Sequence, residues 1–165
     1  MKFSSQEEYG LRCLLRLGIR YQEQGTAGAL SIPEISRVEG LSVPYVAKLL
    51  RILRTGGLVA SARGAAGGYV LARPPERIPV GEVLAVLGGR LYEPGFCASH
   101  AGEESVCTHS VDCSLRSLWR SLQLVMDQVL DNTSLRDLLC NETEMTAWMD
   151  HLVSVVGIMP ASAKN

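Results

Sequence analysis

The stretch SVPYVAKLLRILRTGGLVASARGAAGGYVLA, residues 42–72, decides the fold of this chain. Its first part carries the signals of one helix: a serine cap, a proline in the first turn and two glycines at the end. Apolar residues recur in it at steps of three and four, which predicts a stripe packed on the core. The predicted stripe consists of Val43, Val46, Leu50 and Leu53. Tyr45, Lys48 and Arg51 then lie on the polar side of the helix.

The second part of this stretch predicts a β-hairpin. Strand-like runs at 58–61 and 69–72 flank a glycine-rich tip at 62–68, which carries Arg63. Glycines let the backbone of such a tip approach a sugar-phosphate wall, and an arginine there can enter a narrow minor groove. The alternative is a loop that cradles a nucleotide phosphate. No Gly-Lys-Ser/Thr ending follows, however, and no helix begins at the loop.

Two helices are predicted before this stretch. Ser5 and Glu8 have the spacing of a capping box, and the apolar pattern that follows predicts a helix from Ser5 to Gln24. A second capping signal opens a short helix at 31–38, which a glycine ends. Helix, tight turn and helix form a helix-turn-helix, and the hairpin makes it a winged helix. The expected fold class is mainly α with a small β-hairpin wing, followed by a long dimerisation helix.

The composition predicts a cytosolic protein without a membrane segment. The chain has 165 residues, 47% hydrophobic and 20% charged, with a net charge of -1. No apolar run approaches the roughly 20 residues that a spanning helix needs, and no secretion signal is recognisable at the start. Residues 37–77 hold seven basic and two acidic residues, a balance of +5, whereas residues 93–150 hold three basic and ten acidic residues, a balance of -7. This asymmetry favours a polyanion on the first half, although faces that are merely solvated are the alternative.

Three cysteines lie in the irregular segment that follows the wing: Cys97, Cys107 and Cys113. Three thiolates in one loop can hold an iron-sulphur cluster, because soft sulphur ligands suit iron. Their Cys-x9-Cys-x5-Cys spacing matches no zinc knuckle, and cysteines of a cytosolic chain are not expected to form disulfides. The other two cysteines, Cys13 and Cys140, lie in or beside apolar patterns and are expected to be buried.

A long helix is predicted after the third cysteine. Its apolar residues repeat at steps of three and four over two heptads: Leu115, Leu118, Leu122, Val125 and Val129. Such a seam is suited to a partner helix, so we expect a homodimer, with packing against its own domain as the alternative. The expected division is a winged helix-turn-helix domain at 1–90, a cysteine-rich cofactor loop at 91–113, the dimerisation helix and a short helix at 114–140, and a tail at 141–165.

The chain resembles a family of bacterial winged-helix regulators that includes the iron-sulphur cluster assembly regulator and the nitric-oxide-sensing repressor. The resemblance spans about residues 1–139, and SVPYVAKLL at 42–50, GLV at 57–59, GGY at 67–69 and LARPP at 71–75 are its most specific parts. It implies that one set of residues contacts DNA from the recognition helix and another from the wing. The helix set is Ser42, Tyr45, Lys48 and Arg51, and the wing set is Ser61, Arg63 and Gly64.

The resemblance also implies that the three loop cysteines are cluster ligands, with a two-iron (2Fe-2S) cluster favoured over a four-iron one. The gap between the first two cysteines is longer here than in cluster-binding members. The assembly regulator has a histidine shortly after its third cysteine, and residues 114–116 lack one. In related sensors the fourth ligand is a carboxylate near the amino terminus of the partner subunit, and Glu8 stands at that place. His109, His100 and Asp112 are the local alternatives, and helix capping is the other role open to Glu8.

The expected function is that of a dimeric DNA-binding transcription regulator, a repressor without enzymatic activity. Its binding to an imperfect palindromic operator would be controlled by a cluster that senses redox state, nitric oxide or iron-sulphur status. One alternative keeps the DNA-binding module but gives the cysteines zinc or a thiol switch. Another is a small iron-sulphur redox enzyme or electron carrier, against which the chain lacks a substrate-binding fingerprint and a Cys-x2-Cys pair.

Overall fold

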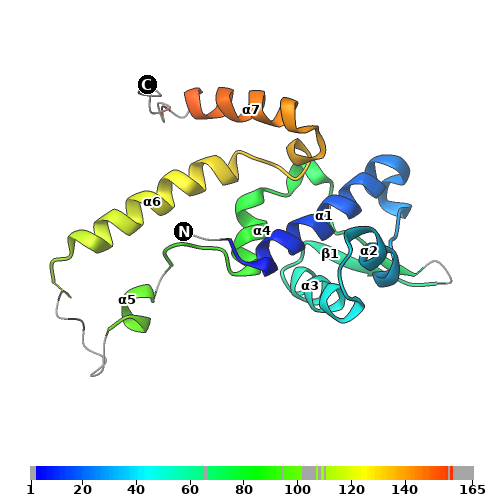
Figure 1. Ribbon diagram of the computed structural model, residues 1–165, viewed down its shortest axis with the longest axis horizontal. Coiled ribbons are helices and arrows are strands. Elements are labelled where there is room, and N and C mark those ends of the chain that lie inside the picture. The colour runs from blue at the N-terminus through cyan, green and yellow to red at the C-terminus, as the bar shows by residue number, and fades with distance from the viewer. Residues whose placement is uncertain are drawn as a thin grey trace.

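The computed structural model describes residues 3–64, 67–93, 95–101, 107, 109, 111–155 and 157. A winged-helix unit is built from α1 to α4 with the hairpin, α6 extends away from it, and α5 lies near the far end of α6 (Figure 1). This mainly helical fold with one two-stranded antiparallel hairpin confirms the expected class. In chain order the elements are α1 (Ser5–Gln24), η1 (Gly25–Ala27), α2 (Ile32–Glu39), α3 (Val43–Thr55), β1 (Val59–Ala62), β2 (Gly68–Leu71), η2 (Pro75–Arg77), α4 (Val80–Leu87), α5 (Phe96–Ser99), α6 (Ser114–Asp131), η3 (Asp137–Leu139) and α7 (Glu142–Val155).

Helix α1 has the predicted bounds, but its capping box lies one residue earlier than predicted. Ser4 is the N-cap: its Oγ accepts a hydrogen bond from the Glu7 amide at 3.3 Å, and the Glu7 carboxylate accepts one from the Ser4 amide at 2.8 Å. The predicted box between Ser5 and Glu8 is therefore wrong. Serine and glutamate each occur twice in succession, so the same spacing fits both pairs and the sequence does not separate them. Glu8 is left exposed on the first turn of α1.

The turn between α2 and α3 follows the predicted pattern. Ser31 and Glu34 form the capping box of α2. Gly40 ends α2 with φ 66°, a left-handed conformation that only glycine adopts without steric cost. Ser42 is the N-cap of α3, yet its hydroxyl makes no capping hydrogen bond and is exposed at the start of the helix.

The inner face of α3 forms the centre of the hydrophobic core. Its fully buried residues are Val46, Leu49, Leu50 and Leu53. They pack with fully buried side chains of the surrounding elements, among them Leu14, Ile35, Leu58, Ile78 and Val83. Val43, which was predicted to belong to this stripe, is 47% exposed. The prediction is wrong at this residue because Val43 and Pro44, the first two residues of α3, are exposed, and the buried face of the helix begins only at Val46.

The wing is an antiparallel hairpin in the register Val59 to Leu71 and Ala62 to Gly68. The strand β2 also pairs with Leu30, because Leu30 and Tyr69 exchange two backbone hydrogen bonds of 3.0 and 2.8 Å. This pairing brings the backbone so close to Gly68 that an added Cβ would lie 2.4 Å from the Leu30 carbonyl oxygen. Gly68 is therefore required for the wing to attach to the helix-turn-helix.

After α6 the chain returns to the winged-helix unit, which the sequence did not indicate. The Leu135 amide donates to the Ile78 carbonyl at 2.8 Å, and the Val80 amide donates to the Thr133 carbonyl at 2.8 Å. Leu135 itself is fully buried. The short helix predicted after the dimerisation helix is only the 3-10 turn η3. The carboxyl end of α6 is thus fixed to the winged-helix unit.

The two cysteines outside the loop differ in burial. Cys13 is fully buried as predicted, and this burial raises the pKa of its thiol to about 12. Cys140 is exposed, and its Sγ donates to the Asp137 carbonyl at 2.8 Å. Its predicted burial is wrong because Leu139, the last residue of η3, packs against Gly18 of α1, and Cys140 follows it outside this contact.

Within the segment expected as a tail, Glu142–Val155 form helix α7, and none of its described residues is buried. Among the described residues, no helix is both long enough and apolar enough to span a membrane.

Candidate DNA-binding face and cysteine pocket

The outer face of α3 carries the predicted recognition residues. Ser42, Lys48 and Arg51 are exposed, and Tyr45 is half-buried at the rim of the core. The Lys48 ammonium lies 5.9 Å from the centre of the Tyr45 ring, a cation-π distance. A groove of about 760 Å³ runs along this face and is lined in part by Pro44, Lys48, Arg51, Thr55 and Val86. The structure therefore places one basic, open surface on α3.

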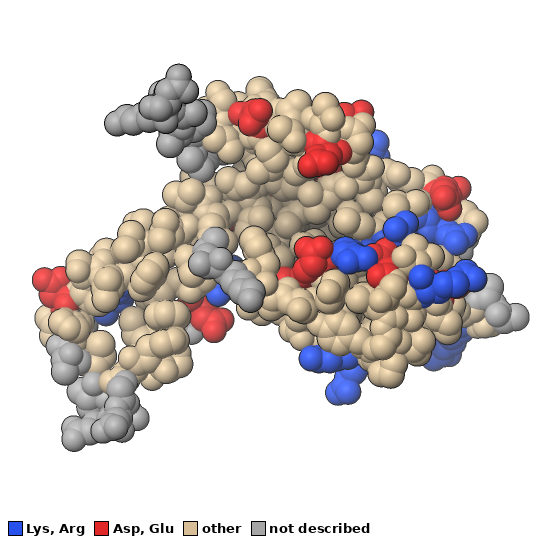
Figure 2. Space-filling view, in the orientation of Figure 1, with Lys and Arg blue, Asp and Glu red and all other residues tan. Residues whose placement is uncertain are grey.

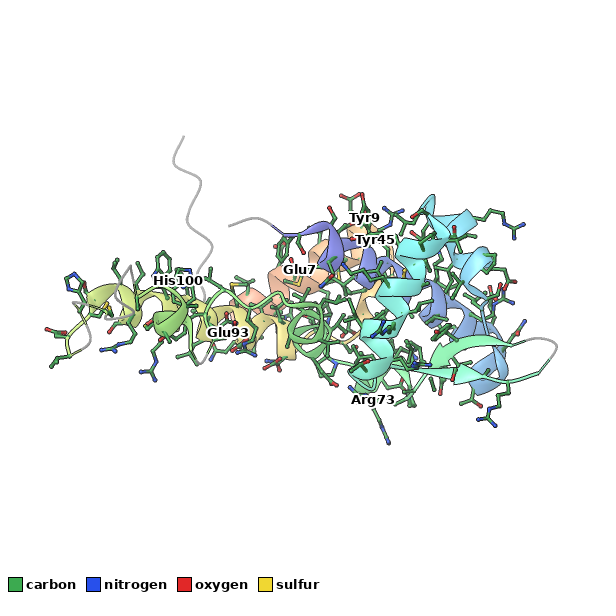
Figure 3. The ribbon with its side chains drawn as sticks, turned by 90° about the horizontal axis from the view of Figure 1, so that it is seen from below. Glu7, Tyr9, Tyr45, Arg73, Glu93 and His100 are labelled. Atoms are coloured by element: carbon green, nitrogen blue, oxygen red, sulfur yellow. The ribbon has the colours of Figure 1, made fainter. Side chains whose placement is uncertain are left out.

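The position of Tyr45 is supported from α1. The Tyr9 ring meets the Tyr45 ring edge-on, with 6.0 Å between centroids and 86° between planes. The Arg12 guanidinium lies 5.4 Å from the centre of the Tyr9 ring. Figure 3 shows Tyr9 and Tyr45 facing one another between the two helices. Sequence reasoning did not single out Tyr9, because residues 36 positions apart in the chain give no local signal of contact.

Helix α2 is tied to α1 by a buried carboxylate. Glu39 accepts a hydrogen bond from Arg12 Nε at 2.7 Å and a second one from Arg16 Nε. The Arg12 guanidinium also donates to the Glu39 carbonyl at 3.0 Å. The Glu39 carboxylate raises the pKa of Arg12, since it stabilises the charged guanidinium. This cluster fixes the helix that precedes the turn into α3, and it was missed from the sequence.

The wing residues lie at or beside the turn that connects β1 and β2. Ser61, Arg63 and Gly64 are exposed, and Gly64 has φ 113°. Part of the predicted tip, Ala65 and Ala66, lies outside the described residues. Figure 2 shows Lys and Arg gathered over the winged-helix end of the molecule, while the visible surface of α6 is largely uncharged. The basic part of this distribution agrees with the positive balance in the first half of the sequence.

The three loop cysteines line one pocket of about 210 Å³ at the amino-terminal end of α6. Cys97 comes from α5, Cys107 from the segment that follows, and Cys113 is the N-cap of α6. The Cys113 Sγ accepts a hydrogen bond from the Arg116 amide at 3.4 Å. The short helix α5 was not expected in this segment. The sequence analysis therefore identified three thiols that the fold brings to the same pocket.

The candidates for a fourth ligand lie in different places. His109 lines the pocket. His100 stacks on Phe96 at 4.1 Å, with its Nδ1 2.8 Å from the Phe96 carbonyl oxygen. Asp112 is exposed and does not line the pocket. Glu8 lies in the first turn of α1 and is not among the residues that line the pocket. Figure 3 shows its neighbour Glu7 on α1, apart from His100.

The donor set of the pocket fits an iron-sulphur cluster in kind. Among the residues the structure describes, no three His, Cys, Asp or Glu groups converge closely enough to hold a single metal ion. The three thiols line one pocket, and the cysteines that hold an iron-sulphur cluster are shared between its irons. Soft sulphur is also the ligand type that such clusters use.

A buried glutamine fixes the segment that leads into the cysteine loop. The Gln123 Oε1 accepts hydrogen bonds from the amides of Leu91 and Tyr92 at 2.8 and 3.0 Å, although Gln123 belongs to α6. Its Nε2 donates to Asp127 at 2.7 Å, and Arg90 donates to the other oxygen of that carboxylate. The sequence analysis gave Gln123 no role, because this residue is polar and lies outside the predicted apolar seam.

The Tyr92 side chain continues this connection to the pocket. Its hydroxyl lies 3.9 Å from Cys97 Sγ, and its ring packs on Phe96 with 5.3 Å between centroids. Burial, together with the contact with Cys97, raises the pKa of the Tyr92 hydroxyl, so the phenol stays protonated at neutral pH.

Replacing Gln123 by leucine should lower the free energy of unfolding by about 3 kcal/mol. The change keeps the side-chain volume but leaves the amides of Leu91 and Tyr92 without their acceptor, and each such loss costs about 1–3 kcal/mol. Urea denaturation followed by circular dichroism measures the effect. The control is Gln128→Leu, an exposed residue of the same helix, which should change stability by less than about 0.5 kcal/mol. Equal midpoints for the two variants would contradict the assigned role.

The comparisons with known proteins agree with this architecture. The family model described as Rrf2, iron-dependent transcriptional regulator, matches residues 3–141. The protein Rrf2 of Nitratidesulfovibrio vulgaris is 35% identical over 139 residues, which cover 84% of this chain and 87% of that protein. The solved structure of T. potens IscR has a TM-score of 0.64 at 33% identity and covers 84% of this chain and 86% of its own. CymR, the global cysteine regulator of B. subtilis, has a TM-score of 0.65 at 32% identity over 84% of this chain and 96% of its own. With a winged helix, a basic outer face on α3 and a family match over most of its length, this chain belongs to the Rrf2 family of transcriptional regulators.

Proposed function

We propose that this protein is a dimeric repressor whose binding to DNA is controlled by an iron-sulphur cluster held by Cys97, Cys107 and Cys113. One observation carries the proposal: these three thiols line a single pocket at one end of α6, while the other end of α6 is fixed to the winged-helix unit. The family match and the similarity to IscR support it. When bound, the cluster would supply a centre that reacts with oxidants or nitric oxide.

The DNA-binding part of the proposal uses the outer face of α3 and the wing. Ser42, Tyr45, Lys48 and Arg51 would enter the major groove, and Ser61, Arg63 and Gly64 would follow the backbone into the minor groove. An apolar seam on α6 remains open to a partner: Leu115, Leu118, Leu122 and Val125 are 58%, 48%, 41% and 41% exposed. A second copy packed on this seam would present two recognition helices about 34 Å apart, which calls for an imperfect palindrome.

We place Glu8 of the partner subunit as the fourth ligand and favour a two-iron cluster. Glu7 closes the cap of α1, so the capping role once open to Glu8 belongs to its neighbour. Glu8 is exposed and does not line the pocket of its own chain, which fits a ligand supplied across a dimer. A carboxylate on iron exchanges readily, which suits a centre that must react.

The experiment that tests the proposal has a cofactor arm and a DNA arm. Protein purified without air should be coloured and contain iron and sulphide. Selection from random duplexes should return an imperfect palindrome, and the affinity for it should change when the cluster is removed. A colourless, iron-free protein whose DNA binding follows thiol oxidation would instead support a thiol switch, the alternative that the similarity to a cysteine regulator favours.

Replacing Glu8 by alanine should alter the visible absorption spectrum of the cluster, because one ligand of one iron is exchanged for water or a thiol. Spectra and iron content of protein purified without air provide the measurement. Glu23→Ala, an exposed glutamate near the other end of the same helix, is the control and should leave the spectrum unchanged. A spectrum of Glu8→Ala identical to that of the wild type would remove Glu8 from the ligand set.

A further inference from the structure

The hydroxyl of Tyr92 lies 3.9 Å from the sulphur of Cys97, and neither DNA binding nor ligation as described above uses it. Resting on the proposed function, we infer that Tyr92 is a positioning residue for the cluster. Its hydroxyl donates a hydrogen bond to Cys97 Sγ and thereby raises the reduction potential of the centre that this sulphur holds.

The surroundings of Tyr92 keep its hydroxyl at this place. Its backbone amide donates to Gln123 Oε1 at 3.0 Å, and Gln123 is only 6% exposed. Its ring packs on Phe96, the residue next to Cys97 on α5. The backbone of Tyr92 is thus attached to α6 and its ring to α5, so the phenol bridges the two elements that carry Cys97 and Cys113.

The chemistry of sulphur sets the direction of the hydrogen bond. A thiolate or an iron-bound sulphur has no proton and can only accept, so the phenol must donate. A hydrogen bond to a ligand sulphur withdraws electron density from the cluster and favours the state with the additional electron. Cys113 receives its hydrogen bond from a backbone amide, which no side-chain substitution removes. The hydrogen bond that Cys97 accepts therefore comes from a side chain, and a single substitution can remove it.

The first arm of the test compares midpoint potentials in the loaded protein. Tyr92→Phe removes one oxygen and keeps the ring contact with Phe96. At a fixed potential near the midpoint, its ratio of reduced to oxidised cluster should be about threefold lower than in the wild type, a midpoint about 30 mV lower for a one-electron couple. Tyr21→Phe makes the same chemical change on α1 and should leave the potential unchanged. Equal midpoints for Tyr92→Phe and the wild type would overturn the inference.

The second arm needs no cluster. In cluster-free protein at neutral pH, iodoacetamide should alkylate Cys97 about threefold more slowly in Tyr92→Phe than in the wild type. The hydrogen bond stabilises the Cys97 thiolate more than it lowers the nucleophilicity of that thiolate, so its loss slows the reaction. Mass spectrometry resolves Cys107 and Cys113 as internal references, whose rates should not change. An unchanged rate at Cys97 would exclude the hydrogen bond. If alkylation of Cys97 were slowed in Tyr92→Phe but the protein never took up iron, the hydrogen bond would be supported and the proposed function would be wrong.

Discussion

Replacing Cys113 by serine should remove the iron and sulphide from the purified protein without unfolding it. Cys113 is the N-cap of α6, where its sulphur accepts the Arg116 amide. Serine is among the best N-cap residues, so the start of α6 should be kept or strengthened. The variant loses only the soft ligand. We expect iron per chain to fall by more than about tenfold, since even the loss of a residue that hydrogen-bonds to a metal ligand lowers metal affinity by that much.

The matched control for this prediction is Cys140→Ser. It makes the same change at an exposed cysteine that does not line the pocket, and it should retain the full content of iron and sulphide. Iron and sulphide analysis, with circular dichroism to follow helix content, provides the measurement. If Cys113→Ser kept the wild-type amount of iron, the cluster would have to be held elsewhere, and the assignment of the pocket would fail.

The double variant Lys48→Ala, Arg51→Ala should bind operator DNA about 100-fold more weakly than the wild type. Both side chains are exposed on the outer face of α3, so the fold should be unaffected. Each lost phosphate contact should also lower the slope of log affinity against log salt concentration by about one. Fluorescence anisotropy at several salt concentrations measures both quantities.

The control for the DNA-binding variant removes two positive charges from the other half of the chain. Arg120 and Arg136 are exposed on and beyond α6, and the double variant Arg120→Ala, Arg136→Ala should keep the affinity and the salt slope within about twofold. If this control weakened binding as much as the α3 variant, net charge alone would explain the effect. The recognition role of Lys48 and Arg51 would then be wrong.

The sequence predicted the elements of the fold well because their signals are local. Helix α1 has the expected bounds, and the glycine after α2 takes the left-handed conformation that the turn requires. The burial of Val46, Leu50 and Leu53 was also predicted, since helical periodicity is visible within one element. The exposure of Val43 was not predicted, because how far the start of α3 projects from the core depends on neighbouring helices.

The features that the sequence missed are contacts between distant residues. Glu39 binds arginines of α1, Gln123 accepts amides more than 30 positions earlier, and Leu135 is buried against the segment before α4. None of these leaves a periodic or spacing signal. The cysteine segment was identified by residue type and by resemblance, and the structure adds that the three thiols line one pocket. Whether they hold a cluster, and with which fourth ligand, stays a prediction.

The attachment of residues 133–135 to the winged-helix unit makes α6 a lever with its pivot at one end. At 1.5 Å per residue, its 18 residues place the pivot roughly 27 Å from Cys113. A displacement of about 2 Å among the thiols would then rotate the helix by only about 4° about that pivot. In an assembly of two chains the small rotations of the two α6 helices would add. A rigid DNA duplex with fixed half-site spacing tolerates little change in the distance or angle between the two recognition helices. In the dimer proposed above, a small change among the thiols would therefore be carried through α6 to the spacing of the two DNA-binding units.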